Sequence, residues 1–232
     1  MNYRILLIAP LAAVVLSVSA ADLRMPAGWQ NYSTRVMATD GPQPHGISAY
    51  EIGIDPASEA GGSASLTVRS VAPLSPSSQP NIGTAHQMLV GYAGKRVRFS
   101  GQVRANAARG WAGLYLGVGD IGLINSLLLA RPGAEKQLPL GAAVPAADDA
   151  WHDVSVVLDV PIDAVSIAFG LVEVGEGQVW ARGLSFDVVG PEVAPTQTRI
   201  GIDLQAVRRV IAESRAQTAK FPPAPLINAA LD

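Results

Sequence analysis

Four side chains near the middle of the chain are of types that bind polar ligands. Arg98 and Gln102 carry hydrogen-bond donors and acceptors, and the aromatic residues Trp111 and Tyr115 follow them. Exposed aromatic rings stack on the C–H faces of sugar rings, while guanidinium and amide groups bond to hydroxyl groups. If these four residues leave one sheet face, they form a platform for a carbohydrate or another polar ligand.

Other aromatic and basic residues fit structural positions better. A tryptophan in a β-sheet protein more often covers the core or an edge than a ligand, so we expect structural roles for Trp151 and Trp180. Arg104 and Arg109 are interpreted as solvated residues of a strand and a turn. The candidate ligand-binding set therefore stays at the four residues named above.

Two pairs of acidic residues, Asp148 with Asp149 and Glu173 with Glu176, have the side chains that a glycosidase needs. Such enzymes place two carboxyl groups roughly 5 to 9.5 Å apart across the bond that they cleave. Both pairs lie in turn-like sequence, which favours solvated loop acids. A calcium-binding loop is the alternative, because several oxygen atoms could converge there. We predict no catalytic residue.

Motifs for metals, cofactors and nucleophiles are weak or absent in the sequence. Residues 117–122 match G-x-G-x-x-G, but the break at 131–133 interrupts the helix that a dinucleotide-binding unit needs. The three histidines, at 45, 86 and 152, lack metal-ligand spacing, and the chain has no cysteine. There is no G-x-S-x-G elbow and no phosphate-binding loop. The sequence predicts no cofactor and no metal site.

The candidate residues lie in segments with the periodicity of β-strands. The segment 97–104 alternates apolar and polar residues, which only a strand places on opposite faces. The segment 112–118 alternates in the same way, with Tyr115 on the face opposite the leucines. Arg98 and Tyr115 are therefore expected to share an outward sheet face.

The same rhythm of short strand-like runs and turn residues extends from 29 to 190. The chain of 232 residues contains 23 Gly and 17 Pro, and only 16% of its residues are charged, which favours many turns and few solvent-facing helices. The sequence predicts an all-β fold with strands over 50–54, 64–70, 85–92, 96–105, 112–118, 154–160, 166–172 and 184–189. The long irregular segment 120–150 is expected to be functional or mobile.

The order and spacing of these strands resemble a bacterial galactose-binding-like, carbohydrate-binding-module-like domain. The segments that carry the resemblance are 50–55, 62–65, 92–100, 112–115, 156–161, 169–171 and 175–180, with Gln87 and Trp151. The resemblance implies an antiparallel jelly-roll β-sandwich that binds a ligand without catalysis. Arg182 stands where such domains commonly have an acidic residue shortly after Trp180, so a binding or metal role of that acid does not carry over.

The ends of the chain differ from its middle. A basic start is followed by an apolar run over 5–18 of about 14 residues, shorter than the roughly 20 of a membrane-spanning helix, and then by small residues. We predict a signal peptide over 1–21, the sandwich over 22–190 and a linker over 191–202. An uncleaved N-terminal anchor is the alternative. Residues 203–232 are expected to form a C-terminal α-helix, capped by Asp203, and an extended Pro-rich tail.

Charge and composition limit the classes of binding partner that the sequence favours. A net charge of −2 gives no general attraction to nucleic acid, and the apolar run is the longest in the chain, so no stable membrane span is expected after cleavage. The sequence favours a periplasmic or secreted, non-catalytic binding module for carbohydrate or another polar ligand. One alternative is a structural module that docks to a protein partner through its C-terminal helix. The other is a hydrolase that uses the 120–150 loop.

Overall fold

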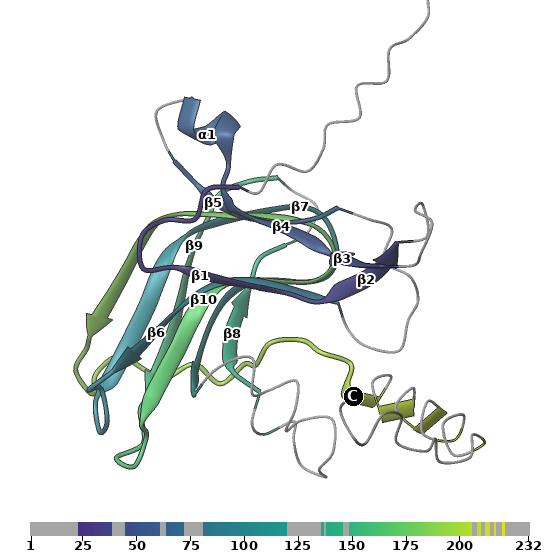
Figure 1. Cartoon of the computed structure of the whole chain (residues 1–232). Coiled ribbons are helices and arrows are strands. Elements are labelled where there is room, and N and C mark those ends of the chain that lie inside the picture. The colour runs from purple at the N-terminus through teal and green to yellow at the C-terminus, as the bar shows by residue number, and fades with distance from the viewer. Residues whose placement is uncertain are drawn as a thin grey trace, which may run out of the picture.

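The computed structural model describes residues 23–38, 45–60, 64–71, 81–119, 136, 138–145 and 149–205, with residues 208, 209, 212, 213, 216 and 220 beyond them. These residues form a β-rich domain (Figure 1). Its elements are β1 (Gln30–Ser33), β2 (Arg35–Ala38), β3 (His45–Ser48), β4 (Tyr50–Ile54), α1 (Pro56–Ala60), β5 (Leu66–Ser70), β6 (Ile82–Val90), β7 (Arg96–Val118), β8 (Leu140–Ala143), β9 (His152–Asp159) and β10 (Ser166–Val188).

Two long strands, β7 and β10, pair with each other and pass through both layers of the domain. Residues 166–174 of β10 pair with β6 and with the second half of β7, which also pairs with β8. Residues 178–181 of β10 pair with β5, and its stretch 178–188 pairs with the first half of β7, which also pairs with β9. One layer is therefore β1-β6-β10-β7-β8 and the other β4-β5-β10-β7-β9, with antiparallel pairing throughout. Only β2 and β3 form a separate ribbon among the described strands. The predicted all-β antiparallel sandwich is confirmed.

The core lies between the two layers and follows the predicted alternation. Val97, Phe99 and Val103 are buried, and so are Leu114 and Leu116 of the same strand. They pack into one cluster with residues of β4, β5, β6, β9 and β10. The sequence predicted β7 and β10 as four separate strands, whereas each is continuous, and it missed β1, β2, β3 and β8.

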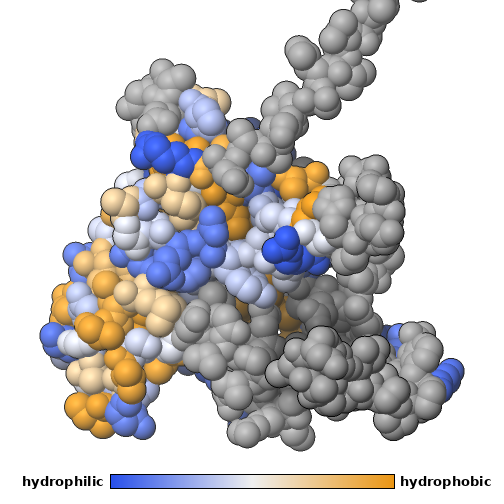
Figure 2. All heavy atoms as spheres, viewed as in Figure 1, coloured by the Kyte–Doolittle hydropathy of each residue, from blue (hydrophilic) through white to orange (hydrophobic). Residues whose placement is uncertain are grey.

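Some apolar residues remain on the surface at one end of the sandwich. Val90 at the end of β6, Val118 at the end of β7 and Val165 just before β10 are all exposed. The pairing of β10 with both neighbours brings these three ends together. Figure 2 shows apolar and polar residues interspersed at the lower left of the molecule, where β6 ends in Figure 1. The strand ends therefore carry both apolar and polar residues, whereas the buried positions are mostly apolar.

A second, smaller cluster covers the outer side of the β1-β6-β10-β7-β8 layer. Leu138, Ile200 and Leu204 pack there against Tyr115 and Val172. The segment predicted as a linker lies along the sandwich: Thr196 exchanges hydrogen bonds with the backbone of Val157, and the Gly141 N–H bonds to the carbonyl of Thr198. These contacts place 196–199 beside β9 and β8, and Ile200 and Leu204 follow on the outer side of the sheet.

The two ends of the chain lie largely outside the described residues. Residues 1–22, which contain the predicted signal peptide, are among those not described, as is most of 206–232. At the start of the predicted C-terminal helix, the Asp203 carboxylate accepts a hydrogen bond from the Gln205 N–H, as an N-cap does (3.0 Å). The described part of the chain contains no helix that is long and apolar enough to cross a membrane.

The bend between the layers requires glycine in both long strands. Gly110 of β7 and Gly175 of β10 face each other in the register and have φ angles of +144° and +103°. A Cβ atom on Gly110 would overlap the carbonyl oxygen of Val174, and one on Gly175 would overlap that of Arg109. The two backbones can approach this closely only without side chains.

Replacing Gly110 with alanine is expected to destabilise the domain by at least about 3 kcal/mol, because backbone strain adds to the overlap. Gly119→Ala is the matched control, since Gly119 also has a positive φ, of +80°, but a Cβ atom there would have no neighbour within 4 Å. Urea denaturation of both variants measures the difference. Equal losses would show that close approach at the bend is not the constraint.

Glu173 lies in the core, which corrects the prediction that it is a solvated loop acid. It is a fully buried residue of β10, and neither carboxylate oxygen has a hydrogen-bond partner among the described residues. Burial raises the pKa of Glu173 to about 8, so the folded protein holds the carboxyl protonated at neutral pH. The nearby Tyr50 hydroxyl does not bond to it but donates to the carbonyl of Gly175 at 2.6 Å.

This raised pKa makes stability depend on pH. The Glu173 carboxyl binds a proton more tightly in the folded than in the unfolded chain. The stability that this proton binding contributes is therefore greatest below about pH 4.5 and is lost as the pH rises toward 8. Glu173→Gln is expected to reduce the slope of the unfolding free energy against pH by up to about 1.4 kcal/mol per pH unit over that range. Urea titrations at pH 5, 6, 7 and 8 test this. Glu176→Gln, on a partly exposed residue, is the control for the loss of a carboxyl group near the bend. A wild-type slope in Glu173→Gln would contradict the assignment.

Candidate functional site

An open polar hollow of about 360 Å³ lies on the outer face of the β4-β5-β10-β7-β9 layer, and we term it the β7 groove. Arg98, Ser100 and Gln102 point outward from β7 because their neighbours Val97, Phe99 and Val103 point into the core. The groove is lined by Arg98, Ser100, Gly101, Gln102, Asp153, Val154, Ser155 and Gly183. The structure thus brings two of the four predicted ligand-binding residues to one open surface.

Hydrogen bonds between neighbouring strands hold the polar groups of the β7 groove in place. The Gln102 amide donates to Asp153 of β9 at 3.2 Å and accepts from the Arg182 Nε of β10 at 3.0 Å. Alongside them, the hydroxyls of Ser100 and Ser185 are 3.0 Å apart. The groups that could bond to a ligand are therefore oriented before it arrives, which lowers the entropy lost on binding.

A stack of tryptophan and arginine side chains adjoins the β7 groove. The Arg104 guanidinium lies 4.2 Å from the ring centre of Trp180 and 5.1 Å from that of Trp151. The Arg182 guanidinium also contacts Trp151, at 4.0 Å from its ring centre. The Trp180 indole N–H donates to Asp55 at 2.6 Å. Trp180 is buried, in keeping with a structural role, whereas Trp151 is only half-buried beside Arg182.

The arginines of this face are matched by acidic or neutral partners. Arg98 forms an ion pair with Asp187 at 3.3 Å, and Arg104 forms one with Asp149 at 3.6 Å. Arg182 bonds to Gln102 and stacks on an indole ring. The groove therefore offers hydrogen-bonding groups of both kinds without a net positive field. Such a surface suits a ligand that is rich in hydroxyl groups and carries no charge.

Tyr115 and Trp111 are not part of this surface, and the prediction that Tyr115 shares an open face with Arg98 is wrong. Tyr115 is fully buried in the second cluster. Trp111 is half-buried there, and a Cβ atom on Gly141 or Gly201 would lie 2.7 or 2.8 Å from its ring. The bend at Gly110 moves the second half of β7 into the other layer, where Leu138, Ile200 and Leu204 pack on its outer face.

The other motifs of the sequence hold no further site among the described residues. His86 is buried, and its Nδ1 lies 3.1 Å from the Thr84 hydroxyl. No group of three or more His, Cys, Asp or Glu in the described ranges is placed to hold a metal ion. Residues 120–122 of the glycine motif, Asp148 and most of the 120–150 loop lie outside the described residues.

Comparisons with known proteins give similar sandwiches but no family. No family model matches the chain, and no curated protein does. The C-terminal family 22 carbohydrate-binding module of a Clostridium thermocellum protein aligns with 14% identity over 72% of this chain and 89% of its own, with a TM-score of 0.41. A xylan-binding domain from Paenibacillus barcinonensis aligns with 12% identity over 72% and 90%, with a TM-score of 0.38. The enzymatically active domain of a bacteriophage CBA120 tailspike aligns with 10% identity and a TM-score of 0.38, and this chain spans 20% of its length. The class of ligand is therefore inferred from the side chains of the β7 groove.

The tryptophan–arginine stack predicts a cost for losing Arg104. Arg104→Ala leaves Trp151 and Trp180 without the cation between them and is expected to destabilise the domain by about 1–2 kcal/mol. Arg109→Ala is the control, because the Arg109 side chain is 86% exposed and its ion-pair atoms are 3.9 Å apart. Thermal unfolding followed by tryptophan fluorescence compares the two. A loss in Arg109→Ala as large as in Arg104→Ala would count against the stack.

Proposed function

We propose that the chain is an exported, non-catalytic carbohydrate-binding module that binds a neutral glycan in the β7 groove. The observation that carries this proposal is the groove itself, an open hollow whose amide, hydroxyl, carboxylate and guanidinium groups are oriented by their own hydrogen bonds. The apolar N-terminal run with small residues after it supports export.

The groove retains hydrogen-bonding capacity for sugar hydroxyls. The Gln102 amide has a second N–H beyond the one given to Asp153, and Asp153 has a second carboxylate oxygen. The Ser155 hydroxyl makes no hydrogen bond to any described residue. A glycan hydroxyl both donates and accepts, so it can use all three. Trp151, which is half-buried beside Arg182, adds an aromatic ring next to these polar groups.

The arrangement of the carboxyl groups supports binding over hydrolysis. A general acid at neutral pH needs a raised pKa and access to the bond that it cleaves. Glu173 has the raised pKa but is sealed between the layers, away from the β7 groove. Asp153 and Asp187 reach the groove face, but Gln102 and Arg98 bind them. The alternative of docking through a free C-terminal helix has less support, because Leu204 at its start is buried against the sandwich.

Replacing Gln102 should weaken glycan binding while leaving the fold intact. We expect Gln102→Ala to weaken binding to a neutral polysaccharide by at least about tenfold, since it removes contacts and frees Arg182 and Asp153 from their orientation. The measurement is a screen of the full chain against neutral and uronate-containing polysaccharides, followed by calorimetry on those that bind.

Arg109→Ala serves as the control, because it changes an exposed side chain of the same strand outside the groove. It should bind like the wild type. Folded wild-type protein that binds no glycan, or Gln102→Ala with wild-type affinity, would refute the proposal. A preference for uronate-containing over neutral polymers would refute its statement on charge.

A further inference from the structure

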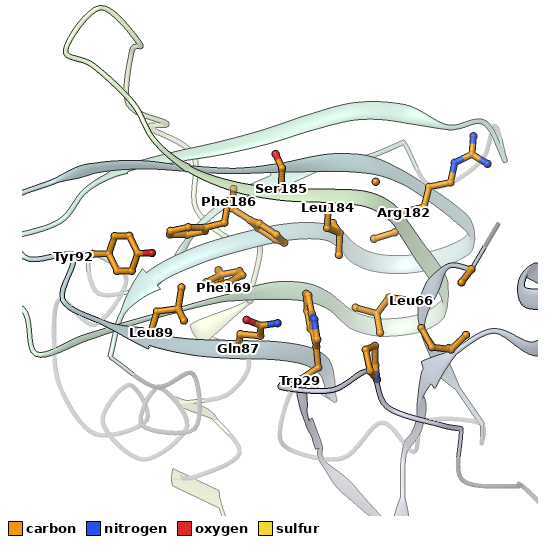
Figure 3. Close-up of a pocket in the computed structure, with 16 residues that line it drawn as sticks. Trp29, Leu66, Gln87, Leu89, Tyr92, Phe169, Arg182, Leu184, Ser185 and Phe186 are labelled. Carbon is orange, nitrogen blue, oxygen red and sulfur yellow. The ribbon is translucent and has the colours of Figure 1, made fainter.

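A second hollow, of about 440 Å³, lies between the two layers, and we term it the inter-layer pocket (Figure 3). It is open because β5 pairs with β10 only over residues 178–181, so the stretch 182–188 has no neighbour on that side among the described strands. Its side walls come from β6 and β10, and Trp29 closes one flank. Its volume is within the usual range for small-molecule sites.

Aromatic rings form most of the walls of the inter-layer pocket. Phe169 and Phe186 stack at 4.6 Å between ring centres with planes 27° apart. Tyr92 meets Phe186 edge-on at 5.2 Å, and Trp29 meets Phe169 edge-on at 6.3 Å. Figure 3 shows these rings around one space, together with Leu66 and Leu89. Such walls favour a flat, apolar ligand that can stack on them.

Polar groups without protein partners point into this apolar space. Figure 3 shows the Gln87 amide between Trp29 and Phe169, and the Tyr92 hydroxyl turned toward the same space. Neither side chain makes a hydrogen bond to any residue that the structure describes. A half-buried amide in an aromatic setting loses water contacts without replacing them. A ligand hydroxyl or amide would supply the missing bond.

The described lining of the pocket places no charge inside it. Among the described residues, Arg182 is the one charged residue that lines it, and its guanidinium lies on the outer face, where it stacks on Trp151 at 4.0 Å. In Figure 3 this side chain extends away from the aromatic rings. A charged ligand would therefore lose its hydration without gaining a counter-charge. The lining selects for a neutral molecule.

We propose that the inter-layer pocket is a second binding site, which takes a small neutral aromatic molecule bearing a hydroxyl or amide group. Its rings would stack between the aromatic walls, and its polar group would bond to Gln87. The site is separate from the β7 groove, because the two hollows open on opposite faces of the same stretch of β10. The proposal does not depend on glycan binding.

The test uses 2-naphthol as the probe and the full chain in a calorimeter. Wild-type protein is expected to bind it with a dissociation constant of roughly 100 µM or tighter. Gln87→Leu keeps the volume of the side chain but removes the amide and should weaken binding about fivefold to tenfold. Ala64→Trp fills the pocket from an exposed position at its rim and should abolish binding without disturbing the core.

Three comparisons decide the outcome. Ser155→Ala, which changes a side chain that lines the β7 groove and not the inter-layer pocket, should bind 2-naphthol like the wild type, so the two proposals can fail separately. Naphthalene-2-sulfonate has the same rings with a charge and should not bind. No binding of 2-naphthol by folded wild type, equal binding by Ala64→Trp, or equal binding of the sulfonate would each overturn the proposal, and thermal unfolding verifies that every variant is folded.

Discussion

The pairing of β7 with β10 is the constraint on which the rest of the molecule depends. The two strands stay paired from one layer to the other, with register shifts after Glu176 and after Arg182, and they bend together where Gly110 meets Gly175. Because both strands change layer at the same point, the two halves of β7 have different surroundings. The first half leaves an open polar face, and the second half receives the cover that buries Tyr115.

The open face keeps an ordered structure because its charges are neutralised locally. Arg104 and Arg182 lie against indole rings, and Arg98 pairs with the Asp187 carboxylate. Guanidinium groups suit this arrangement, since they are planar, weakly hydrated and able to stack while still donating hydrogen bonds. A stable stack therefore fixes the Arg182 Nε that holds Gln102, which in turn holds Asp153. Binding groups of the β7 groove are positioned by contacts that extend well beyond it.

Sequence patterns predicted what local alternation determines and missed what distant segments determine. The outward placement of Arg98 and Gln102 follows from the period of two in 97–104. The burial of Tyr115 depends on Leu138, Ile200 and Leu204, whose docking no local pattern reveals. Glu173 could have been found, because it has the same parity in its strand as the buried Leu171. The stack of Trp151 and Trp180 with arginines requires three strands to be aligned, which spacing alone does not specify.

One irregularity in β10 shapes both hollows. The register with β7 shifts between Arg182 and Ser185, and Gly183 takes a φ of +59° at that bulge. Gly183 lines the β7 groove and also the inter-layer pocket. On the facing strand, a Cβ atom at Gly101 would lie 2.7 Å from Leu184 and 3.1 Å from the Arg182 carbonyl, so glycine lets the bulge sit close to β7. Arg182 faces outward toward Trp151 because it alternates with the core residues Val179 and Ala181, and the bulge after it reverses the alternation so that Leu184 and Phe186 face inward. At this single bulge, the outer face of β10 borders the polar β7 groove and its inner face borders the aromatic inter-layer pocket.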